Sequence, residues 1–304
     1  MTKITDFIKQ SSEVLPGNET QAKLSLLGIL LNRSILIEDV PGMGKTTLVK
    51  FLARITGLDF HRIQFTSDLL PSDILGISIF NKETEKFVFR PGPIFAELVL
   101  ADELNRGTPK TQSALLQAME EKVVTIDGQS FELPSRFCLI ATQNPRGQFG
   151  TYPLPESQLD RFLFKFSMGH LSKEQEAKLL MEGPRSELID KLTTHFNKDI
   201  LNQWQDEIKK VTVSNQLLIY LTDLLHATRN REDFFGLSPR AGLDLMNAAR
   251  GYAWISGRDY VLPDDVLFIF PYVAGHRMFS HYSLTSQQEV SRAMEIASTV
   301  TYIK

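Results

Sequence analysis

The sequence predicts an α/β domain built on a parallel sheet, followed by a smaller domain made only of helices. Two observations lead to this prediction. In the first half of the chain, short apolar runs alternate with helical or loop segments, which is typical of parallel strands buried between helices. After Met168 the strand pattern disappears and helical patterns follow one another. We therefore expect the α/β domain over residues 1–168 and the helical domain over residues 169–304.

The α/β domain is expected to begin with two helices. Ile4, Phe7 and Ile8 indicate a short amphipathic helix, and after a turn at Pro16 and Gly17 a second helix carries leucines on one face. From there the chain alternates between strands and helices. The runs expected to form the parallel sheet span residues 35–37, 63–65, 98–100, 137–141 and 162–166.

Two further segments predict β-hairpins inserted into this unit. Between residues 75 and 89, apolar and polar positions alternate on either side of the polar stretch 81–85. Between residues 123 and 133, alternating apolar residues flank Asp127-Gly128, a favoured two-residue hairpin turn. In the second half, Ser172 and Gln175 form a capping box at the start of the first helix.

The composition is that of a globular protein without a strong electrostatic signature. Hydrophobic residues make up 42% of the 304 residues and charged residues 23%. The formal net charge of −3, from 33 basic and 36 acidic residues, gives no overall attraction to nucleic acid or to an anionic membrane. A net charge of −3 is still compatible with a local basic groove.

The sequence favours a reducing cytoplasm. Its first residues lack an apolar core of signal-peptide length, and no apolar run reaches the length of a membrane span. Cys138, the only cysteine of the sequence, lies in an apolar run and is expected to be a small buried residue. No disulfide can form within the chain, which is usual for a cytoplasmic protein.

The strongest functional signal is a phosphate-binding loop at residues 39–47 (DVPGMGKTT), between the strand at 35–37 and a predicted helix. A phosphate site needs backbone N–H groups, a helix N-terminus, a lysine near the outer oxygens and a hydroxyl for magnesium, and this loop supplies all four. Asp39 replaces the first glycine of the usual G-x-x-x-x-G-K-[ST] pattern, in a turn that aspartate tolerates. The residues expected to bind the phosphates are Pro41, Gly42, Met43, Gly44, Lys45, Thr46 and Thr47, with Thr46 also at the magnesium ion.

Polar residues also end two later strands. Asp102 is placed to hold magnesium through water, and Glu103 to orient or deprotonate an attacking water. Two acids at a strand end are common by chance, but after a phosphate loop they indicate nucleotide hydrolysis. Asn144 follows the strand at 137–141, where an amide can position the attacking water. Taken alone, Asn144 fits better as a turn residue before Pro145.

Four runs together resemble the AAA+ ATPases, and the MoxR family within them. They are EDVPGMGKT, LADELNR, ATQNP and LPESQLDRF, and the resemblance spans roughly residues 15–250. It implies a P-loop NTPase core of AAA+ type followed by a small helical lid, with ATP and Mg²⁺ held between them. The two predicted hairpins resemble the inserts of the MoxR clade.

The resemblance also assigns roles to residues. The phosphate loop corresponds to Walker A, Asp102 and Glu103 to Walker B, and Asn144 to sensor 1. Arg161 resembles the arginine finger that reaches the γ-phosphate of a neighbouring subunit, and Arg240 resembles sensor 2. The implied assembly is a homo-oligomeric ring, in family terms a hexamer. The implied function is ATP hydrolysis that remodels or matures protein complexes, often by cofactor insertion, together with a partner bearing a von Willebrand factor A domain.

Several of these residues have plainer interpretations. Arg161 alone fits a surface arginine paired with Asp160, and Arg240 fits a polar residue at the start of a helix. Arg106 is either close to a neighbouring nucleotide or a solvated arginine. By resemblance, residues 15–18 and part of the lid contact the adenine. The six histidines show no ligand spacing, which argues against a metal site made of histidines.

Two other functions stay open at this stage. A nucleic-acid motor or loader is one, because AAA+ proteins with similar hairpins act on DNA. The slightly acidic net charge and the acidic or mixed hairpin tips argue against it. The other is a nucleotide switch or scaffold that does not hydrolyse ATP, which Glu103 and Arg161 argue against.

Overall fold

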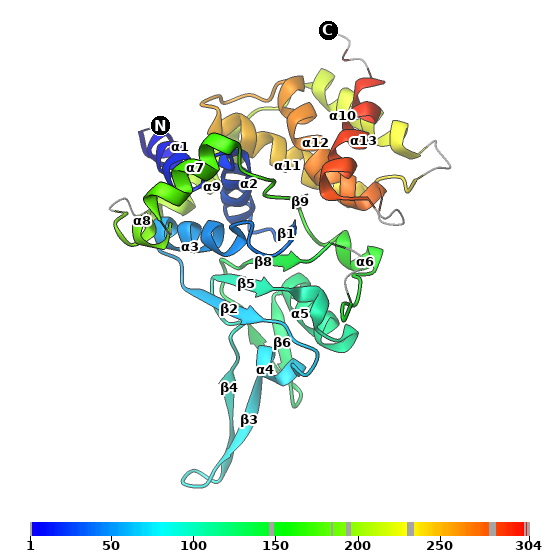
Figure 1. Cartoon of the computed structure of the whole chain (residues 1–304). Helices are drawn as coiled ribbons and strands as arrows, with labels where there is room; N and C mark the ends of the chain where they lie inside the picture. The colour runs from blue at the N-terminus through cyan, green and yellow to red at the C-terminus, as the bar shows by residue number, and fades with distance from the viewer. Residues whose placement is uncertain are drawn as a thin grey trace.

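The computed structural model describes residues 2–145, 149–183, 185–192, 196–229, 234–279, 284–300 and 302. It contains a parallel sheet covered by helices, two projecting hairpins and a set of helices at one edge of the sheet (Figure 1). The predicted α/β core with hairpin inserts and a following helical lid is confirmed.

Five parallel strands form the central sheet in the order β2-β5-β8-β1-β9. β1, β5, β8 and β9 are buried along their whole length because helices cover both faces. Successive side chains point to opposite faces, so Leu98 and Leu100 join one core while Val99 and Ala101 join the other. The strands span Ile35–Glu38 (β1), Phe60–Gln64 (β2), Leu98–Asp102 (β5), Cys138–Gln143 (β8) and Phe164–Phe166 (β9).

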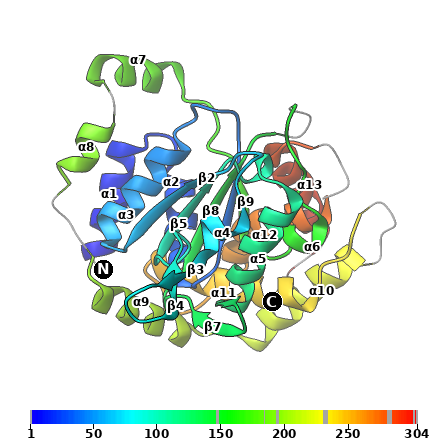
Figure 2. The ribbon, with the colours of Figure 1, turned by 90° about the horizontal axis from the view of Figure 1, so that it is seen from below.

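Helices from the first half cover the two faces. The helices α2 (Glu19–Leu30) and α3 (Lys45–Thr56) lie on one face, with α1 (Thr2–Val14) packed against both. The helix α5 (Pro109–Glu121) lies on the other face, next to the short α4 (Pro71–Leu75). Figure 2 shows α1 and α3 on one side of the strands and α5 on the other. The 3₁₀-helix η1 (Leu104–Arg106) follows β5 directly.

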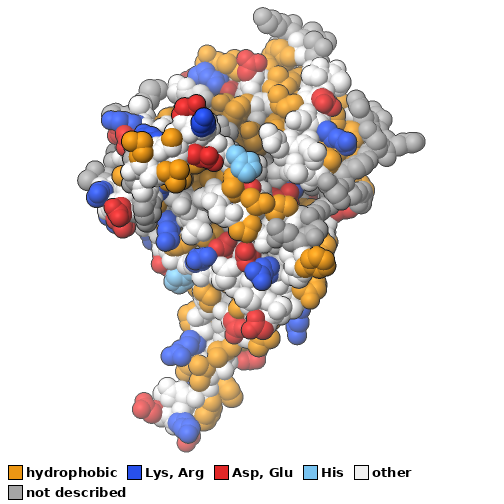
Figure 3. Space-filling model, viewed as in Figure 1, with side chains coloured by type: hydrophobic (Ala, Val, Ile, Leu, Met, Phe, Trp, Pro, Cys, Tyr) orange, Lys and Arg blue, Asp and Glu red, His pale blue; other side chains and the backbone are white. Residues whose placement is uncertain are grey.

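Both predicted hairpins are present. The first consists of β3 (Gly76–Asn81) and β4 (Lys86–Pro91), and the second of β6 (Val123–Ile126) and β7 (Gln129–Glu132). The second turns through Asp127 and Gly128, whose φ angles of 51° and 77° are those of the predicted turn. The first hairpin projects from the body and carries apolar side chains on its surface (Figure 3). Its exposed apolar residues are Ile77, Ile79, Phe80, Phe87 and Val88.

The second half is helical, as predicted. The Ser172 hydroxyl caps its first helix by accepting from the backbone N–H of Gln175, and the Ser172 backbone N–H donates in return to the Gln175 side-chain oxygen. The helices α12 and α13 pack against the edge strand β9, and α11 packs against α2. The helices are α6 (Glu156–Leu159) before the junction, then α7 (Lys173–Glu182), α8 (Ser186–Asp190), α9 (Lys198–Lys210), α10 (Asn215–Arg229), α11 (Pro239–Ile255), α12 (Pro263–Met278) and α13 (Ser286–Ser298). Within the part of the chain that the structure describes, none has the length and apolar character needed to cross a membrane.

Two titratable side chains are fully enclosed by this packing. Cys138 is buried in the sheet, as predicted, and burial raises the pKa of its thiol to about 12. His276 of α12 is also buried, with Nε2 3.1 Å from the carbonyl oxygen of Phe162. Burial lowers the pKa of His276 well below 6.5, and the cationic Arg277 and Lys165 lower it further. The folded chain therefore holds a neutral imidazole near neutral pH.

We predict that acid destabilises the chain through His276. Below pH 6.5 the unfolded chain binds a proton at this imidazole and the folded chain does not. The unfolding free energy therefore falls with decreasing pH, by up to about 1.4 kcal/mol per pH unit, and this effect is absent above the ordinary pKa. Urea titrations of the wild type and of His276→Gln, which keeps a donor for the Phe162 carbonyl, are expected to give a shallower pH dependence in the variant. Equal slopes would contradict the prediction.

Candidate functional site

The candidate site lies where three strands of the sheet end. β1, β5 and β8 are adjacent and parallel, so their carboxyl ends lie at one edge. β1 ends in the phosphate loop, β5 ends at Asp102, and β8 ends one residue before Asn144. The topology therefore brings together the three groups that the sequence places far apart.

The phosphate loop depends on two glycines. Gly42 and Gly44 have φ angles of 89° and 85°, in the left-handed region that side chains with a Cβ rarely adopt. Gly44 occupies the N-cap position of α3, and no side chain caps the helix there. The first N–H groups of α3 therefore point out of the helix end, together with its positive dipole, in the arrangement that binds anions.

Lys45 is the first residue of α3 and its side chain folds along the loop. Its Nζ donates to the carbonyl oxygens of Asp39 and Val40, at 2.5 and 3.2 Å. Burial lowers the pKa of Lys45, while Asp39 and Asp102 are among the acids that oppose the shift. The ammonium group is thus enclosed and faces the acidic end of the sheet.

Asp39 has a different role from the one predicted. We expected it to adopt a glycine-like turn, yet Asp39 does not have a positive φ angle. Its carboxylate instead accepts hydrogen bonds from the backbone N–H groups of Met168 and Gly169, at 2.9 and 3.3 Å. The first residue of the phosphate loop is therefore tied to the segment where the sheet gives way to the helical lid.

Asp102 and Glu103 are held by the hydroxyl of Thr142. This hydroxyl donates to Asp102 Oδ1 at 2.6 Å and accepts from the backbone N–H of Glu103 at 2.9 Å. Glu103 has a φ angle of 55°, which is uncommon for a residue with a side chain and redirects its carboxylate at the strand end. A single threonine on β8 thus fixes both acids at the end of β5.

Three further side chains contact these acids, and two of them, Arg62 and Gln64, had no signal in the sequence. Arg62 forms an ion pair with Asp102 at 2.6 Å, and Gln64 Nε2 donates to Glu103 Oε2 at 3.0 Å. Both come from β2, the strand beside β5, and Gln64 lies opposite Asp102 in the register. Arg106 also pairs with Glu103, at 3.0 Å. The Arg106 side chain is 52% exposed, so this contact leaves both expectations for Arg106 open.

Asn144 lies beside the glutamate, as its place in the series of strands predicts. Its Nδ2 is 3.5 Å from Glu103 Oε1. The side chain of Asn105 holds the Asn144 backbone from both sides, accepting from its N–H at 3.2 Å and donating to its carbonyl oxygen at 3.0 Å. Asn105 therefore sets the position of Asn144, and no local pattern in the sequence marks it.

A cavity of about 660 Å³ opens over the phosphate loop. It is lined by Gly42, Gly44 and Thr47 on one side, and by Leu15 and the junction at residues 168–171 on another. This volume is in the usual range of ligand pockets. The segment at residues 15–18, expected to lie near an adenine, contributes to the same cavity, as does helix α7 of the lid.

Arg161 and Arg240 lie elsewhere, against α5. Arg161 donates from NH1 to the carbonyl oxygen of Leu116 at 2.9 Å. Arg240 donates to both carboxylate oxygens of Glu120, at 2.8 and 2.9 Å, and this contact lowers the pKa of Glu120. Neither arginine is among the described residues that line the cavity over the phosphate loop. Asp102, Glu103 and Asn144 do not line this cavity either, so the position of the two arginines is defined by their contacts with Leu116 and Glu120 of α5.

Comparison with known proteins identifies the family. A family model described as ATPase family associated with various cellular activities (AAA) matches residues 34–164, and an AAA lid domain matches residues 226–296. Chaperone MoxR1 of Mycobacterium tuberculosis is 39% identical over 295 residues, which cover 92% of this chain and 77% of the relative. The chain belongs to the MoxR family of AAA+ ATPases.

Other similar proteins span nearly the same length. The Bacillus subtilis protein YeaC, of uncharacterised function, is 46% identical over 275 residues, which cover 90% of this chain and 86% of YeaC. A crystal structure of a Cytophaga hutchinsonii protein superposes with a TM-score of 0.84 at 36% identity, over 100% of this chain and 96% of the other. The similarity to solved and curated proteins therefore covers nine tenths or more of the chain.

The loop and strand ends fit ATP and Mg²⁺, the ligands that the MoxR family implies. A Cβ added to Gly42 or Gly44 would meet no atom within 4 Å, so the surface of the loop is open for phosphates. Thr46 and Asp102 offer hydroxyl and carboxylate oxygens, which Mg²⁺ prefers. Asn144 Oδ1 is buried without a hydrogen-bond partner among the described residues and is an acceptor beside Glu103.

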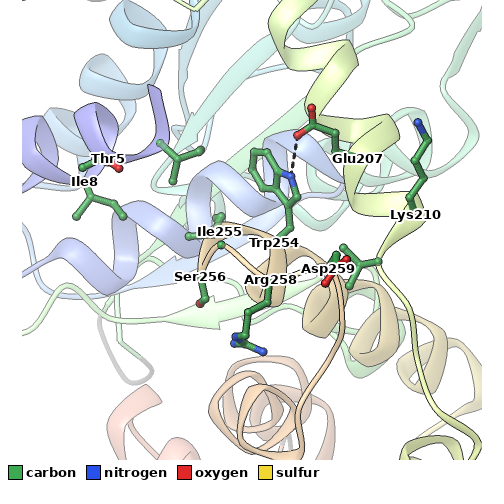
Figure 4. A pocket seen from close by; sticks show the side chains of 12 residues that line it. Thr5, Ile8, Glu207, Lys210, Trp254, Ile255, Ser256, Arg258 and Asp259 are labelled. Carbon is green, nitrogen blue, oxygen red and sulfur yellow. Dashed lines mark hydrogen bonds between the residues drawn. The ribbon is translucent and has the colours of Figure 1, made fainter. Parts of the chain in front are cut away.

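A second cavity lies away from the phosphate loop, between other elements. It measures about 700 Å³ and lies between α1, the end of α9 and the end of α11 (Figure 4). Trp254 closes one wall and donates from Nε1 to Glu207 at 2.9 Å. Its lining shares no residue with the cavity over the phosphate loop.

Proposed function

We propose that this MoxR-type chain hydrolyses ATP at the end of the sheet and uses the reaction to remodel a protein complex. The observation that carries the proposal is the convergence of Lys45, Asp102, Glu103 and Asn144 at the ends of three parallel strands. Family membership supports nucleotide binding and ATPase activity in general, and this convergence supports the assignment to particular residues.

In this proposal each group has a separate task. The N–H groups of residues 42–47 and Lys45 bind the phosphates, and Thr46 with Asp102 hold Mg²⁺. Mg²⁺, when bound, offsets negative charge on the phosphates. Glu103 orients the attacking water and accepts its proton, and Asn144 fixes the water from the other side. Gln64 and Arg106 position the Glu103 carboxylate through their contacts with Oε2.

We further propose that Arg161 and Arg240 act on the site of a neighbouring copy. Both are held against α5, Arg161 through the carbonyl oxygen of Leu116 and Arg240 through the carboxylate of Glu120. A head-to-tail ring of identical subunits, a hexamer by family resemblance, would bring this region of one copy to the phosphate loop of the next. Arg161 would then serve as the arginine finger, and Arg240 as sensor 2, in trans.

The proposed output is motion of the lid against the core. We place the boundary at Met168, so that residues 1–168 form the core and 169–304 the lid, and Asp39 links the phosphate loop to this junction. Contacts with the γ-phosphate would change during the cycle and move the two parts. We propose a chaperone-like role in the cytoplasm, maturing a client complex or inserting its cofactor, with a von Willebrand factor A domain protein as partner.

Action on nucleic acid is the alternative motor function. The net charge of −3 and the apolar surface of the β3–β4 hairpin favour a protein client over a polyanion. Binding to DNA that weakens steeply with salt would favour the alternative.

The first prediction separates binding from chemistry. Lys45→Ala removes the cation at the phosphates and is expected to abolish ATP binding. Glu103→Gln keeps the loop intact, so it is expected to bind ATP normally but to lower turnover by about 10²-fold or more. Fluorescent-nucleotide titration and phosphate release measure the two properties. Equal loss of binding in both variants would contradict the assignment.

The second prediction tests the arginine finger. Arg161→Ala is expected to bind ATP but to lose roughly 10³-fold or more in hydrolysis. When Arg161→Ala and Lys45→Ala chains are mixed, the Lys45→Ala chain keeps a working finger and the Arg161→Ala chain keeps a working phosphate loop. Part of the hydrolysis should therefore return. If verified mixed rings stay inactive, Arg161 does not act in trans.

A further inference from the structure

Arg277 of α12 is an arginine that nothing in the proposed reaction uses. Its side chain is 4% exposed and is surrounded by both core and lid. Burying a guanidinium is unfavourable unless each N–H finds a partner, so its partners indicate what it holds. NH1 donates to the Val273 carbonyl oxygen of α12 itself, at 3.1 Å. The other partners belong to two groups of residues, one beside Arg161 and one on the helix of Arg240.

The first group is the segment that carries Arg161. Arg277 NH2 donates to the carbonyl oxygens of Asp160 and Phe162, at 3.1 and 3.0 Å, and Nε forms an ion pair with the Asp160 carboxylate at 2.9 Å. The residues on both sides of Arg161 are therefore bound to one guanidinium. His276 Nε2 reaches the same Phe162 oxygen from the preceding position on α12. Asp160 therefore pairs with Arg277, and not with Arg161 as the simpler interpretation of the sequence expected.

The second group is on α11. Arg277 NH2 donates to Asp244 Oδ2 at 2.7 Å, and Asp244 lies four residues after Arg240 on the same helix. Asp244 Oδ1 accepts from Arg33 at 2.5 Å, which fixes this carboxylate from the core side. Arg240 itself is held to α5 through Glu120. One buried side chain thus connects the start of α11 to the segment at residues 160–162.

We propose that Arg277 is a positioning residue for the trans arginines. It sets the segment of Arg161 and the helix of Arg240 at one fixed spacing, so that both guanidiniums reach a neighbouring γ-phosphate together. The inference rests on the proposed trans action of these arginines. Arg277 does not contact the nucleotide of its own chain, so its loss affects what the chain gives to its neighbour and spares its own phosphate loop.

The guanidinium geometry is essential to this role. Its planar fork reaches three backbone carbonyls and two carboxylates at once, whereas a lysine ammonium on a flexible stem cannot span them. Arg277→Lys keeps the charge but releases part of this network. A displacement of about 1 Å in a reacting group can cost about 10²-fold in rate, so we expect a loss of that order in hydrolysis with ATP binding unchanged.

Mixed rings separate this role from a general structural one. Arg277→Lys chains are mixed in turn with Lys45→Ala chains, which keep working arginines, and with Arg161→Ala chains, which lack the finger. In rings that mix Arg277→Lys with Lys45→Ala, phosphate release is expected to return to the level of rings that mix Arg161→Ala with Lys45→Ala. In rings that mix Arg277→Lys with Arg161→Ala, it is expected to stay low. If Arg277 only stabilised the fold, its substitution would also impair the phosphate loop of the variant chain. Hydrolysis would then stay low in both mixtures.

Two further variants serve as controls. Asp160→Asn removes a partly exposed partner of Arg277, so it tests the proposal even if Arg277→Lys folds poorly. Its hydrolysis is expected to fall less than that of Arg277→Lys, and to be restored by Lys45→Ala but not by Arg161→Ala. Arg258→Lys is the matched control, because Arg258 also pairs with an aspartate of α12, Asp265, but contacts neither group of residues. It is expected to hydrolyse ATP at the wild-type rate.

The outcomes are distinguishable. The positioning role is overturned if rings of Arg277→Lys and rings of Asp160→Asn hydrolyse ATP at the wild-type rate. It is also overturned if mixing with Lys45→Ala does not restore hydrolysis to Arg277→Lys. In either case, rescue of Arg161→Ala by Lys45→Ala would still support trans action. If Arg161→Ala is itself not rescued by Lys45→Ala, trans action fails and the role of Arg277 fails with it.

Discussion

The site depends on the parallel pairing of β5 with β8 and β1, and on the hydroxyl that joins two of these strands at their ends. Thr142 takes one hydrogen bond from the backbone at Glu103 and gives one to Asp102. Because side chains alternate along a strand, a shift of one residue in this pairing would turn Thr142 away from both acids. The acids would then lose the geometry that relates them to the phosphate loop on β1.

A second constraint is the separation between the phosphate loop and the two arginines. Glu120 and the carbonyl of Leu116 hold Arg240 and Arg161 along α5, whereas the cavity over the loop lies beside α3 and α7. In the proposed mechanism, a ring would complete each reaction centre from two copies, and hydrolysis would then depend on the ring. Arg277 and Asp244 give the arginine half a rigid frame of its own.

The sequence predicts the elements of this fold well, because each has a local signature. Four of the five strands were visible as buried apolar runs, whereas β2 begins at Phe60, three residues before its predicted start, and is largely exposed. The Asp127-Gly128 turn specifies its hairpin, and two glycines with a lysine specify the phosphate loop. Asp102, Glu103 and Asn144 could be assigned because parallel strands bring their ends together. The order of motifs then led to the MoxR family, which the relatives confirm.

The supporting residues had no such signature. Arg62, Gln64 and Asn105 act through contacts with residues about 40 positions away, which no local pattern encodes. Arg277 looks like an ordinary helix residue until its partners in the core are known. Asp39 was misjudged because its partner, the backbone at Met168, lies across the junction with the lid. The roles of Arg161 and Arg240 stay predictions, with their placement against α5 in favour of action in trans.

The most direct test of the account is a cryo-electron microscopy structure of Glu103→Gln with ATP and Mg²⁺. We expect the triphosphate along the backbone of residues 42–47, Mg²⁺ at Thr46 and Asp102, and Arg161 and Arg240 from an adjacent copy at the γ-phosphate. A nucleotide bound away from the phosphate loop, or a γ-phosphate contacted by Arg240 of the same chain, would contradict the account.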